Sequence, residues 1–269
     1  MSSAAKTLAL LSYFSADRPE LGLSEFCKIA GRDKATTYRH LQVLEDTGFI
    51  EKNALTKQYR LGPAILNLAH MREITVPRQA SAEMALRVLA DKTGETAHVS
   101  VLSGETLYPL LARESPRHAT RAIVDLETLP LHATASGACA LAFGPATLTD
   151  VARRNLTKFT KHTPTNRKRL DAIIKEARET GFGHSHRGFQ EDIESVAAPL
   201  FDQTDRFAGA VSVACVATRF SADAKRTIKK CLIQASSEIS RNWGGTIPAD
   251  IEALWSGPSD ISRTLESAS

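Results

Sequence analysis

The chain has 269 residues, 42% of them hydrophobic, and its 34 Lys and Arg against 30 Asp and Glu give a formal net charge of +4. This length suits two domains, the apolar fraction argues against wholesale disorder, and the mild positive charge permits an acidic partner without requiring one. No apolar run approaches a membrane span, and no signal-peptide cleavage site follows the N-terminal apolar stretch, so we expect a cytoplasmic protein with no membrane partner.

The first predicted element is a helix over residues 4–16. Its apolar side chains recur at helical spacing, with Leu8, Leu11 and Phe14 on one face. The polar stretch 17–22 contains both Pro and Gly and breaks this helix.

Two more helices follow at short spacing. The second covers 24–30, with Ser24 as its N-cap, and ends at Gly31. Asp33 caps the third, which runs to about Thr47. Helices separated by so tight a turn are typical of a helix-turn-helix.

The third helix has two different faces. Thr37, Leu41 and Leu44 recur at i, i+4 and i+7, and this stripe should pack on the preceding helices. The opposite face carries small, polar and basic residues that can approach base edges or neutralise phosphates. These candidate DNA-binding residues are Lys34, Ala35, Thr36, Tyr38, Arg39 and Gln42.

Residues 49–61 are predicted to form a short hairpin, which would be the wing of a winged helix-turn-helix. It contributes Lys57 and Tyr59 to the candidate DNA-binding set, with other polar and basic residues beside them. A basic helix taken alone is more often a solvent-exposed surface helix than a DNA-recognition helix. Here helix order, hairpin and charge placement coincide, which favours double-stranded DNA as the partner of residues 1–62.

Beyond the hairpin, residues 63–76 are predicted to form a linker helix that starts at Pro63. Residues 77–245 have the mixed periodicity of an α+β domain with an antiparallel sheet. The predicted elements are a helix over 80–93, strands over 98–102 and 107–111, a helix over 167–180, a hairpin over 195–216, and a long helix capped by Ser221. Residues 246–269 are rich in Ser, Pro and Asp and are expected to be a loosely held tail.

Three blocks of this sequence resemble the IclR family of transcriptional regulators. They are LSEFCKIAGRDKATTYRHLQVLEDTGFIEK at 23–52, LPLHATASGACALAF at 129–143 and TGFGHSHRGFQEDIESVAAPLFD at 180–202. The resemblance implies a GAF-like effector domain that binds a small organic acid, and homodimers that often pair into tetramers. It places the effector pocket on Leu129, Ala135, Ser136, Ser185, Ile193, Ser195, Ser212 and Ala214.

The sequence departs from that family pattern at four positions. Gly188 stands where the signature usually has Glu, and Ser185 stands where relatives that bind glyoxylate or pyruvate tend to have Asp. Ser195 replaces a frequent Cys, and Ala214 a frequent Ser. We therefore expect a small carboxylate effector, for example a glyoxylate- or pyruvate-like oxo-acid, that modulates operator binding, with Ser136, Ser195 and Ser212 as its hydroxyl donors.

An enzyme and a redox sensor are the alternatives, and neither has a positive feature in the sequence. The chain lacks a nucleophile elbow, a P-loop and a dinucleotide fingerprint, so we expect no catalytic residue and no cofactor. The cysteines Cys27, Cys139, Cys215 and Cys231 stand far apart, and those in apolar runs are expected to be inert core thiols.

Three histidines are weaker candidates for site residues. His184 and His186 would share one face of a strand, with Glu191 and Asp192 close behind. Two histidines alone do not make a metal site, so we expect none. His132, beside the pocket block, suits either a carboxylate ligand or a structural hydrogen bond.

Overall fold

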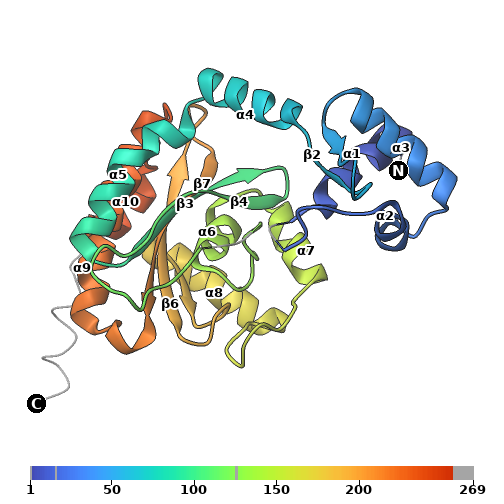
Figure 1. Ribbon diagram of the computed structural model, residues 1–269. Coiled ribbons are helices and arrows are strands. Elements are labelled where there is room, and N and C mark those ends of the chain that lie inside the picture. The colour runs from blue at the N-terminus through green and yellow to red at the C-terminus, as the bar shows by residue number, and fades with distance from the viewer. Residues whose placement is uncertain (1, 16, 125–126, 257–269) are drawn as a thin grey trace, which may run out of the picture. The chain divides into compact units, whose positions relative to one another are not determined.

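The computed structural model describes residues 2–15, 17–124 and 127–256 (Figure 1), and the chain divides into two compact units between Pro77 and Arg78. Among these residues, no helix combines the length and the apolar character that crossing a bilayer requires.

The first unit has the element order of a winged helix-turn-helix, followed by one further helix. Its elements are α1 Ser3–Leu8, a 3₁₀ turn Ala9–Tyr13, α2 Leu23–Ala30, α3 Lys34–Asp46, β1 Ile50–Lys52, β2 Tyr59–Leu61 and α4 Pro63–Thr75. Strands β1 and β2 form an antiparallel hairpin, and Leu21 pairs with Tyr59 on its other edge. The core contains Leu10, Phe14, Leu21, Phe26, Leu41, Leu44, Ile50 and Tyr59.

The start of this unit differs from the sequence prediction in two details. The first helix is α-helical only to Leu8 and then tightens, and the change of pitch buries Leu10 while Leu8 stays 58% exposed. Helix α2 starts from Gly22 and not from Ser24, because the Glu25 carboxylate accepts the Gly22 N–H at 2.7 Å and closes the first turn earlier.

The second unit is an α+β fold built on one antiparallel sheet, as predicted. Its elements are α5 Arg78–Thr93, β3 Thr96–Ser103, β4 Thr106–Arg113, α6 Ala135–Phe143, α7 Thr147–Arg154, α8 Arg167–Thr180, β5 Gly183–His186, β6 Ile193–Phe201, β7 Phe207–Val216, a 3₁₀ turn Ala217–Arg219, α9 Ala222–Asn242 and α10 Ala249–Ser256. The strand order is β4-β3-β7-β6-β5, so β5 is an edge strand.

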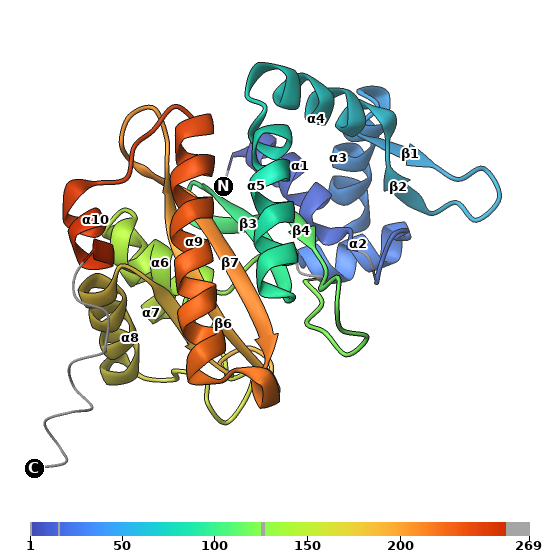
Figure 2. The same cartoon turned by 90° about the vertical axis from the view of Figure 1, so that its left-hand side faces the viewer.

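Helices cover both faces of this sheet. Figure 2 views it from the side of α5 and α9, with α6, α7 and α8 behind. Ala97, Val99, Val211 and Val213 belong to the core beneath α5 and α9. The alternate residues of the same strands face α6, and many of them are small or polar. This second face therefore has room for a cavity.

Helix α6 approaches the sheet unusually closely at its N-terminal end. A Cβ on Gly183 would lie 2.1 Å from the Ala135 carbonyl oxygen, and one on Gly137 would lie 2.4 Å from the Leu131 carbonyl oxygen. Only glycine tolerates such contacts, so Gly183 lets the start of α6 approach β5, and Gly137 lets the backbone at Leu131 approach α6.

The expected loose tail is wrong for residues 249–256, which form α10. Ile247, Ile251 and Trp255 recur at helical spacing, and the first two are buried in the core beneath α6 and α8. The Trp255 indole N–H donates to the Gly181 carbonyl at 3.2 Å, and its ring lies 5.6 Å from that of Phe182. Residues 257–269, the rest of that predicted tail, lie outside the described residues.

Candidate functional site

Helix α3 presents the predicted DNA-reading face to solvent. Lys34, Ala35, Tyr38, Arg39 and Gln42 are exposed and Thr36 is half-buried, whereas the opposite stripe is buried in the core. The helix therefore offers two cations, an amide and a phenol on one accessible face, which suits contacts to phosphates and base edges.

Three cationic side chains lie around His40 on α3. The pKa of His40 is held below its ordinary value, first by burial and then by the charges of Arg32, Arg39 and Lys6. At the N-terminus, the Thr36 N–H donates to the Asp33 carboxylate at 2.8 Å, a bond that lowers the pKa of Asp33 and defines the start of the helix.

The wing has one predicted contact residue at its surface and one inside. Lys57 lies in the β1–β2 loop with φ of +61° and is exposed. Tyr59 is only 1% exposed, because its ring packs edge-on against Phe26 in the core, 6.2 Å between centroids. The structure thus corrects the prediction for Tyr59, which supports the hairpin from inside and has no surface for DNA.

A cavity on the α6 side of the sheet brings together seven of the eight predicted effector residues. Its lining consists of His98, Ala122, Ile123, Val124, Leu129, Thr134, Ala135, Ser185, Phe189, Gln190, Ile193, Ser195, Ser212 and Ala214. Its volume is about 50 Å³, and one water needs roughly 10–15 Å³ on this measure. The space therefore suits a ligand of few heavy atoms.

Strand register explains why residues distant in sequence meet there. One row across the sheet joins Ser185, Ser195 and Ala214, and the next joins Ala197, Ser212 and His98. The two rows share the face that is covered by α6, so all of these residues except Ala197 line the cavity.

The sequence reasoning missed His98, the most buried titratable group of the cavity. Its Nε2 lies 3.4 Å from the Ser136 hydroxyl, and its Nδ1 is buried without a hydrogen-bond partner among the described residues. Burial lowers the pKa of His98 to about 4, so the imidazole is neutral at neutral pH. A buried nitrogen without a partner in the chain is available to hydrogen-bond a bound ligand.

The serine hydroxyls of the cavity are not equally available. Ser212 donates to the Val196 carbonyl at 3.0 Å, and Ser185 donates to the Ala133 carbonyl at 2.7 Å. Ser136 does not line the cavity, and its hydroxyl lies 3.4 Å from His98 Nε2. Ser195 forms no side-chain hydrogen bond within the described chain, so it is the hydroxyl best placed to bind a ligand.

The N-terminus of α6 adds donors beside these side chains. Thr134 caps the helix by accepting the Gly137 N–H at 3.0 Å. The N–H groups of Ala135 and Ser136 belong to the first turn, where no intrahelical acceptor exists. Because backbone donors and the helix dipole favour an anion there, a carboxylate is the ligand type that this end of the cavity suits best.

Other candidate residues have structural partners. The His132 ring nitrogen lies 2.8 Å from the Thr157 carbonyl, outside the effector cavity, so the structural alternative holds for this residue. Cys139, Cys215 and Cys231 are buried, and burial raises the pKa of Cys139 and of Cys215 to about 12. These thiols are therefore poor nucleophiles at neutral pH.

Comparison with known sequence families gives two matches in chain order. Residues 3–54 match the IclR helix-turn-helix domain, and residues 75–241 match the C-terminal domain of IclR bacterial transcriptional regulators. The HTH-type transcriptional regulator XynR of Escherichia coli is 26% identical over 244 residues, which cover 90% of this chain and 97% of that protein. The relatives found are transcriptional regulators and not enzymes.

Solved structures give the same grouping. An IclR-type regulator from Silicibacter sp. TM1040 is 38% identical, with a TM-score of 0.88 over 93% of this chain and 99% of the other. An IclR homologue from Microbacterium hydrocarbonoxydans, crystallised with 4-hydroxybenzoate, is 18% identical, with a TM-score of 0.74 over 90% of this chain and 99% of that one. The second similarity is one of fold.

Proposed function

Because the chain belongs to the IclR family of bacterial transcriptional regulators, we propose that a small carboxylate in the α6 cavity controls its binding to operator DNA. The DNA-contacting residues in this proposal are Lys34, Ala35, Thr36, Tyr38, Arg39, Gln42 and Lys57. Each α3 would enter a major groove, and the wing would contact the adjacent backbone.

One observation carries the effector proposal: the buried His98 has an unpaired Nδ1 in a cavity that also contains the start of α6. His98, the Ser195 hydroxyl and the first α6 N–H groups would bind the carboxylate, while Leu129 and Ile193 supply an apolar wall. Ser185 and Ser212 hold the backbone around them through their carbonyl bonds.

The size of the cavity narrows the ligand class. A volume of about 50 Å³ favours an oxo- or hydroxy-acid of two to four carbons, such as glyoxylate or pyruvate. The fold relative crystallised with 4-hydroxybenzoate carries an aromatic carboxylate, which supports the functional group but not the same size. Ser185 in place of an acidic residue would remove a repulsive charge and admit a dicarboxylate.

We also propose that the active form is a homodimer, or a tetramer of two dimers. Helix α4 has no buried residue, and Leu66, Leu68, Met71 and Ile74 on it are 48–74% exposed. Apolar side chains gathered on one short helix favour burial against another copy. A symmetric dimer would present two recognition helices to a two-fold related operator.

Isothermal titration of the full chain against glyoxylate, pyruvate, succinate and 4-hydroxybenzoate tests the effector proposal. At least one of the small acids should bind, and Ser195→Ala should raise its Kd about tenfold, because a charge-assisted hydrogen bond contributes about 1.5–3 kcal/mol. Ser103→Ala removes an exposed hydroxyl of the same sheet and should leave the Kd unchanged. If none of these acids binds the wild type, or if Ser195→Ala binds equally well, the effector assignment fails.

A further inference from the structure

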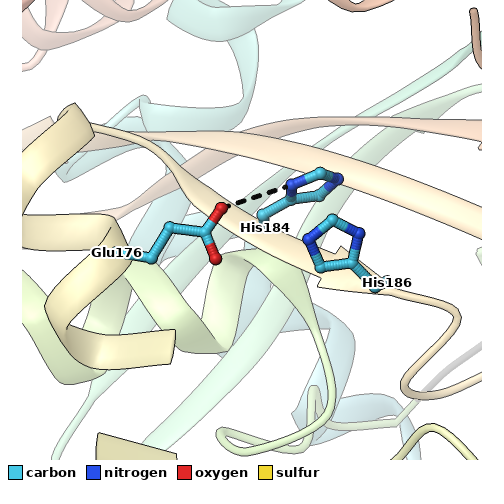
Figure 3. Close-up of side chains that lie close together, drawn as sticks. All are labelled: Glu176, His184 and His186. Carbon is cyan, nitrogen blue, oxygen red and sulfur yellow. Dashed lines mark ion pairs between the residues drawn. The ribbon is translucent and has the colours of Figure 1, made fainter. Parts of the chain in front are cut away.

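A second polar cluster lies on edge strand β5. Ser185 lines the effector cavity, whereas His184 and His186 flank it and project from the opposite face of the strand. Glu176 reaches this cluster from α8, and Glu194 lies opposite His186 on β6. Figure 3 shows the Glu176 carboxylate and both imidazole rings turned toward one another.

The distances in this cluster are short for groups that do not hydrogen-bond. The Glu176 Oε1 atom lies 3.7 Å from His184 Nδ1. On the other side, Glu194 Oε2 lies 3.4 Å from His184 Nε2 and 3.3 Å from His186 Nδ1. One candidate ligand atom from each of Glu176, His184 and His186 can be chosen so that all lie within 4.8 Å of one another.

Two of the buried atoms in the cluster lack hydrogen bonds. The His184 side chain is 4% exposed, and its Nε2 has no hydrogen-bond partner among the described residues. The same holds for Glu194 Oε2, on a side chain that is 14% exposed. Buried polar atoms are normally satisfied, but these two face each other at 3.4 Å without forming a hydrogen bond, so the side chains of the cluster do not fully satisfy one another in this arrangement.

We propose that Glu176, His184 and His186 bind one divalent transition-metal ion of the Zn²⁺ type, with Glu194 orienting the two imidazoles. Imidazole nitrogen and carboxylate oxygen are ligands that Zn²⁺ prefers, whereas Ca²⁺ and Mg²⁺ require mainly oxygen. Ligand atoms about 2.1 Å from a tetrahedral ion are about 3.4 Å apart, so small side-chain rotations would close the site.

The surroundings fit this assignment. Glu194 Oε2 lies 3.4 Å from a nitrogen of His184 and 3.3 Å from one of His186, close to the position from which a carboxylate fixes the tautomer of a metal-binding histidine. The His186 side chain is 57% exposed, which leaves the fourth position open to water or an exogenous ligand. Glu191 does not take part, because it pairs with Lys161 at 2.8 Å. The carboxylates that the fold brings to the two histidines are therefore Glu176 and Glu194, and not the nearby Glu191.

Titration of the tag-free, metal-stripped full chain with Zn²⁺ and Co²⁺ tests the proposal. One ion should bind per chain, and Co²⁺ should give the visible absorption of a tetrahedral nitrogen and oxygen site. His186→Ala and Glu176→Gln, both on side chains that are partly exposed, should each weaken binding at least tenfold, and Glu194→Gln should weaken it by 10–100-fold.

His70→Ala is the matched control, because it removes an exposed histidine from α4 and should leave metal affinity unchanged. Three results would overturn the proposal. They are the absence of one bound ion per chain, a metal affinity in both His186→Ala and Glu176→Gln equal to that of the wild type, and an intense near-ultraviolet band that shows Co²⁺ bound to a cysteine thiolate. If the cluster is only an ion-pair network between β5, α8 and β6, no ion should bind stoichiometrically.

Discussion

At the scale of single residues, His98 shows how burial sets the charge of the effector cavity. Its pKa of about 4 means that the ring carries no charge above pH 5. A neutral imidazole can donate or accept one hydrogen bond at Nδ1 without the cost of a buried ion. The residue therefore suits recognition of a carboxylate through a directed bond and not through a full salt bridge.

The same pKa predicts a pH dependence of stability. Above pH 6.5 His98 is neutral in both folded and unfolded chains and has no effect. As the pH falls from 6.5 to about 4, His98 binds a proton in the unfolded chain but stays neutral in the folded chain, so the folded state loses stability. The loss reaches about 3 kcal/mol below pH 4, from the difference between the two pKa values.

Urea unfolding of wild type and His98→Gln at pH 7.5 and pH 4.5 measures this effect. The two tryptophans, Trp243 and Trp255, both lie in the second unit, so their fluorescence reports its unfolding selectively. Between the two pH values, the free energy of unfolding should shift by about 2–3 kcal/mol in favour of His98→Gln. If the free energies of unfolding of wild type and His98→Gln differ by the same amount at both pH values, the fold does not keep the ring neutral.

At the scale of elements, we expect DNA binding to depend on α3. Lys34→Ala together with Arg39→Ala should weaken operator binding and reduce the slope of log K against log salt by about 2, because two phosphate contacts are lost. Neither side chain is buried, so the melting temperature should hold. Fluorescence anisotropy across a salt series measures both affinity and slope.

The control is the double variant Arg154→Ala with Lys158→Ala, which also removes one Arg and one Lys but from exposed positions of the second unit. This pair should leave the salt slope near that of the wild type. A wild-type slope in the Lys34 and Arg39 variant would mean that another surface contacts the phosphates.

Local features of the elements were predictable from sequence, whereas features set by tertiary packing were not. The caps Asp33 and Ser221 and the stop at Gly181 depend on a few adjacent residues, and the structure has all three. Tyr59 was misplaced because a three-residue strand gives too little periodicity to tell its buried face. Helix α10 was missed because polar residues obscured its apolar spacing.

The candidate site shows the same division. Seven of the pocket positions that the family resemblance identified line one cavity, but the resemblance did not identify His98, which lines it too. Thr96, His98 and Ser100 alternate with apolar residues, which in a half-exposed sheet would place them in solvent. Helices cover both faces here, so the polar row is buried as well. Recognising it required the second layer of helices, which strand periodicity alone does not reveal.

At the scale of the whole molecule, we infer that α4 carries the signal between effector and DNA. It is the last element of the first unit, and only Val76 and Pro77 follow it before the second unit. At its start, the Ala64 N–H donates to the carbonyl of Gly48, in the turn between α3 and β1, at 3.1 Å. A stiff connector can convert a small shift in one unit into a changed spacing of two recognition helices.

A flexible Gly-Ser segment inserted after Thr75 tests this coupling. Effector affinity by calorimetry and basal operator affinity should remain near wild type, since both binding faces are untouched. The change in operator affinity on adding effector should fall toward zero, because a flexible linker cannot transmit a shift of one unit to the other and the coupling free energy is lost. An equally long insertion in the exposed turn 203–205 is the control, and full control of DNA binding after the Thr75 insertion would contradict the mechanism.

The burial of three of the four thiols has a practical consequence for following this regulator at work. Cys27 on α2 is the one cysteine with partial solvent access, and the other three are shielded within the second unit. A maleimide dye added to the folded protein would therefore attach first to the DNA-binding unit, without engineered substitutions. The native chain thus has one preferred site for a thiol-reactive dye, a few residues before the start of α3.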